Sequence, residues 1–195
     1  MKRRAALKRL VLLVLIAGAF YLLFRFYWRR KTAQEDLDLS RLHSRHKLFD
    51  ALADAVIPKT NTPGASEAGV GAFIIHMLHY CATPKEVGNF ILGCNDLEAY
   101  CTATFGTSFI DCTMEQKQLV LNHFESRDYR LGYFGYRVNA KIFGKSFISL
   151  LKHWTVWGYC TSQVGATQGM AYDEIPGTYE SCLPLVAHQR CWATQ

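Results

Sequence analysis

A run of residues without a charged side chain, 10–24 (LVLLVLIAGAFYLLF), lies near the start of the chain and divides it into two parts. With the residues up to Trp28 the stretch contains 19 residues and one charge, Arg25. Roughly 20 residues of helix cross the hydrocarbon core of a bilayer, and an arginine near the end of such a helix can reach the interface. The run therefore predicts an N-terminal transmembrane or signal helix that is separate from the folded domain.

The charge of the chain follows the same division. Residues 1–31 hold nine Lys and Arg and no acid, whereas residues 32–195 hold 13 Lys and Arg against 16 Asp and Glu, a net charge of −3. A domain that binds nucleic acid needs basic residues on its folded face, so the charge argues against nucleic acid as a partner. The basic residues instead indicate a targeting or anchoring leader.

The leader resembles a twin-arginine export signal, a type that exports proteins already folded. Arg3 and Arg4 precede a short spacer and Lys8, although Ala6 stands where such signals usually carry Phe or Leu. Residues 17–19 (AGA) fit a cleavage site, but the apolar run continues past them into a basic cluster, which favours a retained anchor. Both alternatives place the domain on the periplasmic side of the inner membrane. A retained anchor leaves the N-terminus in the cytoplasm.

Beyond the leader we expect a tether over residues 32–45 and one domain over residues 46–195, which is all-α with long ordered loops. Apolar residues recur at helical spacing in residues 46–57, and Pro58 ends that helix because proline cannot continue it. The next segment, 59–69 (KTNTPGASEAG), is rich in turn formers and predicts a loop.

The rest of the domain carries further helix signals. A mostly buried helix is expected over residues 69–81, and Thr83-Pro84-Lys85-Glu86 has the spacing of a capping box that opens a helix to about Thr104. Thr113 opens another helix to about Glu125, and residues 145–162 form the last. Residues 129–143 give no secure pattern, and the chain beyond Gly165 is rich in turn formers.

Seven cysteines are a high number for a domain of this size. None belongs to a C-x-x-C or C-x-x-C-H pattern, so the local spacings of structural zinc and of covalent haem are missing. Export would favour disulfides with one cysteine left over, and the alternative is a set of buried free thiols. The possible disulfide cysteines are Cys81, Cys94, Cys101, Cys112, Cys160, Cys182 and Cys191.

No set of residues points clearly to catalysis or to a cofactor. The chain has no G-x-G-x-x-G after a strand and no P-loop, and the histidine pairs in residues 43–46 and 76–79 lack further metal ligands. Ser149 and Lys152 form an S-x-x-K pattern without its companion motifs. We therefore assign no catalytic, cofactor-binding or metal-binding residue, and keep an enzyme with a cysteine or Ser-Lys nucleophile as an alternative.

Two segments carry a family resemblance. The first is residues 55–65 (AVIPKTNTPGA), which continues to residues 68–70 (AGV). The second is residues 157–165 (WGYCTSQVG), followed by residues 172–179 (YDEIPGTY). With the helices between them, they resemble subunit 3, the gamma or small subunit, of membrane-bound gluconate 2-dehydrogenase and of related flavin-linked sugar and polyol dehydrogenases.

The resemblance implies a non-catalytic subunit in a three-part complex. In such a complex a large subunit binds FAD and oxidises gluconate or a related sugar or polyol. A multihaem subunit with haem c passes the electrons to the membrane quinone. The small subunit supports export, maturation and assembly of the FAD subunit, so FAD and haem c are expected in the partners. An assembly module for another oxidoreductase is the alternative.

The resemblance also suggests which residues meet the partner. We expect a rigid turn at Pro63-Gly64, with Gly64 able to adopt a positive φ, and a type II turn at Pro176-Gly177. Tyrosine offers contact area and a hydroxyl at low entropic cost, which suits an interface. Alternatively, both segments only hold the domain together. The candidate partner-binding residues are Thr62, Pro63, Gly64, Tyr172, Pro176, Gly177 and Tyr179.

Overall fold

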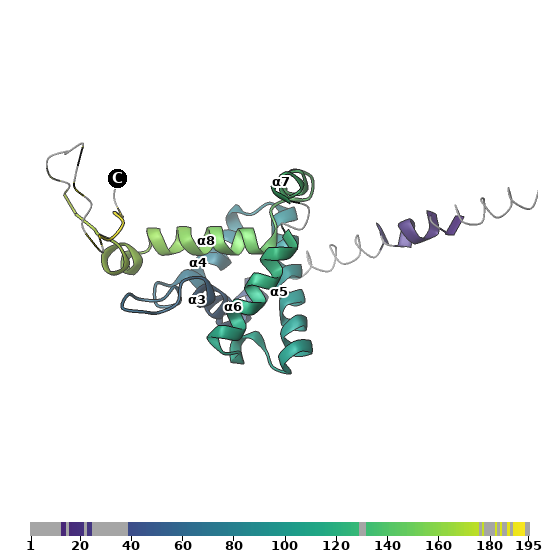
Figure 1. The fold of residues 1–195 in the computed structure, drawn as a ribbon, viewed down its shortest axis with the longest axis horizontal. Coiled ribbons are helices and arrows are strands. Elements are labelled where there is room, and N and C mark those ends of the chain that lie inside the picture. Colours follow the sequence, from purple (N-terminus) through teal and green to yellow (C-terminus); the bar gives the residue numbers. More distant parts are fainter. Residues whose placement is uncertain are drawn as a thin grey trace, which may run out of the picture.

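The structure of the chain is a computed structural model. It describes residues 13–14, 16–21, 23–24, 39–128, 132–175, 177, 182, 184, 187 and 189–193. These residues form helices and no strand, apart from one isolated parallel bridge between Ala171 and Trp192 (Figure 1). The all-α prediction is therefore confirmed.

The predicted loop 59–69 lies between helices α3 and α4. Helix α2 spans Leu39–Ser44 and α3 spans His46–Val56. Ile57 caps α3 directly before Pro58, so the helix and its end are as predicted. Helix α4, Val70–His76, begins after Gly69, which has a φ of 74°.

Helix α4 continues into η1, a π-helical turn over Met77–Cys81 that the sequence did not predict. Helix α5, Pro84–Phe105, then begins with the predicted capping box. The Thr83 side chain accepts a hydrogen bond from the Glu86 backbone N–H, and the Glu86 carboxylate accepts one from the Thr83 backbone N–H. Gly106 ends α5 with a φ of 71°, a left-handed conformation that glycine adopts without a steric penalty.

After the 3₁₀ turn η2, Phe109–Asp111, the described residues form four further helical elements. These are α6 (Met114–Asp128), α7 (Gly132–Phe143), α8 (Phe147–Thr161) and the π-helical turn η3 (Gly165–Gly169). The predicted helices at 113–125 and 145–162 correspond to α6 and α8. Helix α7 fills most of the segment 129–143, where no secure sequence pattern indicates a helix or a strand.

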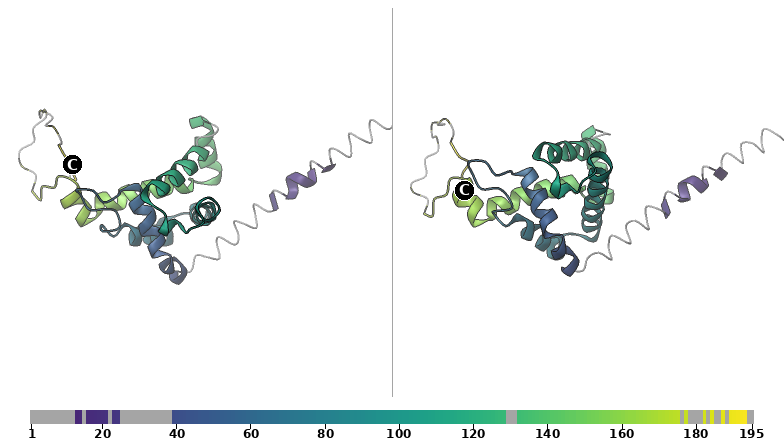
Figure 2. Two further views of the ribbon diagram at one scale, coloured as in Figure 1. Left: turned by 60° about the horizontal axis from the view of Figure 1, so that its bottom comes forward. Right: turned by 90° about the horizontal axis from the view of Figure 1, so that it is seen from below.

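The core lies where α3, α4 and α5 pack against α8 (Figure 2). The fully buried ring of Phe90 on α5 is its centre, with centroids 5.9 Å from Phe49, 5.2 Å from Phe147 and 5.3 Å from Trp154. Gly93 permits this contact, because a Cβ there would lie 2.3 Å from the Cβ of Phe147. Helices α5 and α8 can therefore approach closely only because this position has no side chain.

The described residues between 13 and 24 are helical. None of the helices in the described part of the chain is both long and apolar enough to cross a membrane. The remaining residues of the predicted stretch 10–28, the basic ends of the leader and residues 32–38 of the tether lie outside the described residues.

Candidate partner-binding site

The loop between α3 and α4 is held by side chains and backbone of its own neighbourhood. The backbone N–H of Ala65 donates to the carbonyl of Ile57 at 3.0 Å, and that of Ser66 donates to Oδ1 of Asp54 at 2.8 Å. Lys59 and Glu67 form an ion pair across the loop, and the hydrogen bond from Lys59 lowers the pKa of the exposed Glu67 carboxyl. The loop therefore has a defined shape.

Gly64 is buried within this loop, and its role differs from the prediction. It is not among the glycines with a positive φ; in this loop that conformation belongs to Gly69. Glycine is needed at 64 because a Cβ would lie 3.0 Å from Oδ1 of Asp54 and 3.0 Å from the backbone nitrogen of Lys59. The expectation of a left-handed Gly64 was wrong; the close approach of the Asp54 side chain and the Lys59 backbone favours glycine at this position instead.

A hydrogen bond from Tyr159 on α8 links the loop to a segment that is distant in the sequence. The Tyr159 hydroxyl donates a hydrogen bond of 2.9 Å to the carbonyl of Pro63. Gly169, the last residue of η3, lies so near that a Cβ on it would be 2.3 Å from this hydroxyl oxygen. The first and second family segments therefore meet at Tyr159. We call this meeting point of the loop, the C-terminal end of α8 and η3 the junction (Figures 1 and 2).

A close contact between α4 and α8 supports the junction. The rings of Phe73 and Trp157 meet edge to face with centroids 5.9 Å apart. A Cβ on Gly158 would lie 2.6 Å from the Phe73 ring, so glycine is required for this contact. Trp157 remains 47% exposed, and its outer part is available for contact with another molecule.

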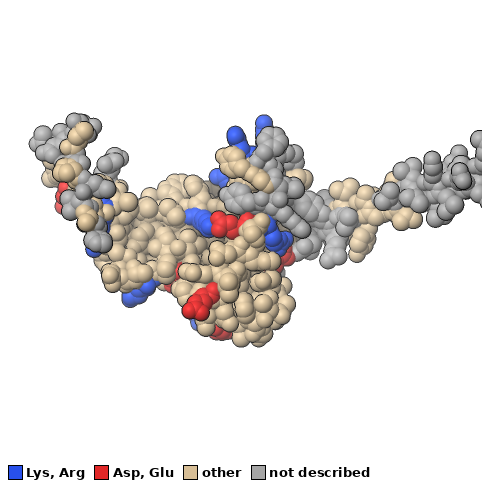
Figure 3. Space-filling model, viewed as in Figure 1, with Lys and Arg blue, Asp and Glu red and all other residues tan. Residues whose placement is uncertain are grey.

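Large apolar side chains are exposed at and beside the junction. Val156 precedes Tyr159 by one helical turn and is 48% exposed, and Tyr172 and Ile175 follow η3 at 45% and 86%. In the view of Figure 3 most of the body carries neither Lys or Arg nor Asp or Glu, although a row of charged side chains crosses its middle and Lys and Arg also lie at the top, on α7. An apolar and aromatic surface with little charge is typical of the centre of a protein interface.

The predicted partner-binding residues differ in how far they are buried. Thr62 and Pro63 are half-buried, Gly64 is buried, and Tyr172 is exposed. Gly177 is also exposed, while Pro176 and Tyr179 lie outside the described residues, as does the turn predicted for them. The sequence did not single out Tyr159, although it belongs to the second family segment, because its partner lies 96 positions away.

The residues of the alternative Ser-Lys site point to separate partners. The Tyr136 hydroxyl donates to Oγ of Ser149 at 2.8 Å, and the Lys152 ammonium lies 2.7 Å from Oε1 of Glu125. Ser149 and Lys152 are therefore each engaged in contacts between helices. Within the residues that the structure describes, no cluster of three or more His, Cys, Asp or Glu could hold a metal ion.

A cavity of about 380 Å³ that the sequence did not reveal lies between α5, α6 and the connection from α7 to α8. Nδ2 of Asn89 donates to the carbonyls of Phe143 and Lys145 at 3.0 and 2.9 Å, which fixes this connection. Ser146 donates to Asp128 and also caps α8. Burial raises the pKa of the Asp128 carboxyl, against the lowering effect of the Ser146 hydrogen bond. The polar groups here hold α8 in place.

The fold and the junction define a class of protein: a small helical domain in which segments distant in the sequence meet, with exposed apolar side chains nearby. Residues 43–177 match the family described as gluconate 2-dehydrogenase subunit 3. The match contains every helix from α3 to α8 and both segments of the junction. The chain therefore belongs to the gluconate 2-dehydrogenase subunit 3 family. No curated protein and no solved structure matches the chain.

Proposed function

We propose that the chain is the non-catalytic small subunit of a membrane-bound gluconate 2-dehydrogenase-like complex. Its partners are a large FAD subunit, which oxidises gluconate or a related sugar or polyol, and a multihaem cytochrome c subunit. The observation that supports this most strongly is the family match, which spans the whole helical body of the domain. FAD and haem c reside in the partner subunits, and this chain supports export, maturation and assembly of the FAD subunit.

We propose the junction as the surface that binds the FAD subunit. Tyr159 holds the loop against α8, so the loop and α8 reach the partner already ordered. Ordering before binding lowers the entropic cost of association, and exposed aromatic and aliphatic side chains supply area to bury. Val156, Trp157, Tyr172 and Ile175 are the side chains that such a partner would cover.

The leader gives the proposal its cellular setting. Arg3-Arg4 followed by an apolar run suits export of a folded protein, and the large subunit would be exported together with this chain. The domain would then lie in the periplasm, next to the inner membrane. A retained leader would in addition attach the complex to that membrane.

Co-expression with the FAD subunit tests this function. The large subunit is expressed with the full chain, without it, and with the Arg3→Lys, Arg4→Lys double variant, which changes the leader but leaves the domain intact. We expect periplasmic, FAD-loaded and active large subunit only with the unchanged chain. With the double variant we expect the assembled pair to stay in the cytoplasm. Export and activity of the large subunit without this chain would show that the proposal is wrong.

A further inference from the structure

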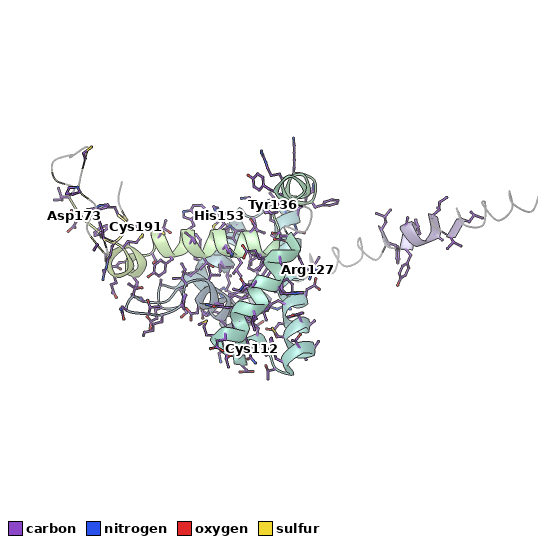
Figure 4. All side chains as sticks on the ribbon, viewed as in Figure 1. Cys112, Arg127, Tyr136, His153, Asp173 and Cys191 are labelled. Carbon is purple, nitrogen blue, oxygen red and sulfur yellow. The ribbon has the colours of Figure 1, made fainter. Side chains whose placement is uncertain are left out.

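Two of the seven cysteines face each other in the turn that joins α5 to α6. Cys101 lies in the last turns of α5, and Cys112 follows η2 directly before α6. Both side chains are buried, at 0% and 5% exposure. Gly106 reverses the chain between them, which brings η2 back against α5. Cys112 is labelled in Figure 4 at this end of the body.

The two thiols lie where η2 packs against the end of α5, and both belong to the buried core. Thr107 Oγ1 lies 3.5 Å from Sγ of Cys112, which holds Cys112 in this turn. Burial, followed by the neighbouring Cys112, raises the pKa of the Cys101 thiol to about 12. Two buried cysteines that a short turn brings together as neighbours need little backbone movement to be joined.

Cys94 provides the contrast within the same helix. It lies two turns before Cys101 on the same buried face and is 1% exposed. Burial raises its pKa to about 12 as well, and the charged groups that act on it are Arg45 and Glu98, of which Glu98 also acts on Cys101. Cys94 is thus a buried thiol of similar environment, but Cys112 is not among the groups that act on it.

We propose that Cys101 and Cys112 are a disulfide site, oxidised by a disulfide-bearing oxidant such as oxidised glutathione or a protein disulfide. The structure shows both as free thiols, the reduced state of the pair. The bond closes the turn 101–112 and ties the end of α5 to the start of α6. An exported domain meets oxidants of this class. The assignment does not depend on the proposed function.

The difference in burial sets the order of the reaction. Cys112, the less buried of the two, attacks one sulfur of the oxidant as a thiolate, breaking its S–S bond and releasing one thiol. Cys101 then attacks Sγ of Cys112 in the mixed disulfide and releases the second thiol. The two cysteines lose two electrons and two protons, and the oxidant gains both. Because both thiols are buried, the exchange proceeds during folding or through local opening of the turn.

Peptide mapping of the full chain tests the pairing. The reduced chain is unfolded, refolded with reduced and oxidised glutathione, blocked with N-ethylmaleimide and digested without reductant. Chymotrypsin is required, because no Lys or Arg lies between residues 86 and 116, whereas Phe105 and Phe109 lie between the two cysteines. We expect a linked peptide pair containing Cys101 and Cys112, in the wild type and in Cys94→Ser.

Thermal unfolding provides the second readout. Closing a turn of this length should raise the unfolding midpoint by about 5–10 °C over the reduced chain, and dithiothreitol should reverse the increase. Cys94→Ser should keep the increase, and Cys112→Ser should lose it. Recovery of wild-type Cys101 and Cys112 as blocked or glutathionylated thiols, or linked to other cysteines, would overturn the assignment. Wild-type mapping alone decides this if a variant fails to fold.

Discussion

The hydroxyl of Tyr159 donates a hydrogen bond of 2.9 Å to the backbone carbonyl of Pro63, which lies 96 positions earlier in the chain. This bond joins the loop between α3 and α4 to the last turn of α8. The Pro63 carbonyl belongs to an irregular segment, and an unpaired carbonyl at a half-buried position is unfavourable. The bond thus stabilises the loop and fixes its position relative to the second family segment.

Replacing Tyr159 by Phe removes this hydrogen bond and keeps the ring. We expect the free energy of unfolding to fall by about 1 kcal/mol, the usual effect of one hydrogen bond, with the far-UV circular dichroism unchanged. For a domain of this size the midpoint of thermal unfolding should fall by about 2–4 °C. Urea and thermal denaturation measure both.

Tyr172→Phe is the matched control, because Tyr172 is exposed and should lose little with its hydroxyl. Tryptic cleavage at the exposed Lys59 should be faster in Tyr159→Phe than in this control, since the loop opens more often. Equal stability and equal cleavage in the two variants would show that the bond does not hold the loop.

Replacing either of two glycines of α5 by alanine should change the free energy of unfolding, in opposite directions at the two positions. At Gly93 the new Cβ would lie 2.3 Å from Phe147, so Gly93→Ala should destabilise the domain by about 1–3 kcal/mol. At Gly88 no atom lies within 4 Å of the Cβ position, so Gly88→Ala should stabilise it by about 0.5–1 kcal/mol through helix propensity. Urea denaturation of both variants checks the prediction, and a stable Gly93→Ala would contradict the close packing of α5 on α8.

The carboxyl of Asp128 should make stability depend on pH. Burial raises the pKa of this carboxyl in the folded state above the ordinary 3.8 of the unfolded chain. At pH values between the ordinary pKa and the raised pKa, the folded state therefore binds more protons than the unfolded state. The free energy of unfolding therefore falls as pH rises through this interval. Asp128→Asn removes the effect, so its stability relative to wild type should increase from pH 3.5 to pH 7 in urea titrations.

Glu67 provides a comparison of the opposite sign. Its pKa is lowered below 4.5, first by the hydrogen bond from Lys59, so its contribution is present above pH 4.5 and is lost as pH falls through the lowered value. Glu67→Gln should be less stable than wild type at pH 7, with the difference vanishing in acid. Parallel pH profiles for Asp128→Asn and Glu67→Gln would contradict both assignments.

Thiol reactivity in the reduced chain should separate into two groups. Cys81, Cys182 and Cys191 are exposed and should react with Ellman's reagent within minutes at pH 8. Cys94 and Cys101 should react only after unfolding, because burial raises the pKa of both thiols to about 12. Guanidinium chloride should release the whole set, and fast reaction of Cys94 in the folded chain would be inconsistent with this core.

Local signals explain the features of the fold that the sequence predicted correctly. Pro58 and the capping box of Thr83 and Glu86 act within one helical turn, so a short window of sequence contains their whole cause. These elements did not depend on knowledge of their tertiary partners.

Tertiary contacts explain what the sequence did not predict. Gly64 was expected to be left-handed, but Asp54 and Lys59 crowd its Cβ position, and that crowding exists only after folding. The role of Tyr159 could not be recognised from the sequence, because its hydrogen-bond partner lies 96 positions away. The sequence therefore indicated the two segments that meet in the fold, whereas the hydrogen bond that joins them became evident only in the structure.

Binding of the FAD subunit at the junction is tested most directly by co-purification. A tagged large subunit is expressed with the full chain carrying Val156→Glu at the junction, Ile175→Glu beside it (together the junction variants), or Leu119→Glu, an exposed apolar residue on α6. We predict that each junction variant reduces the amount of chain recovered at least about tenfold, as expected for a charge placed in an apolar interface, while Leu119→Glu leaves it unchanged. Undiminished recovery of both folded junction variants would contradict the proposed surface.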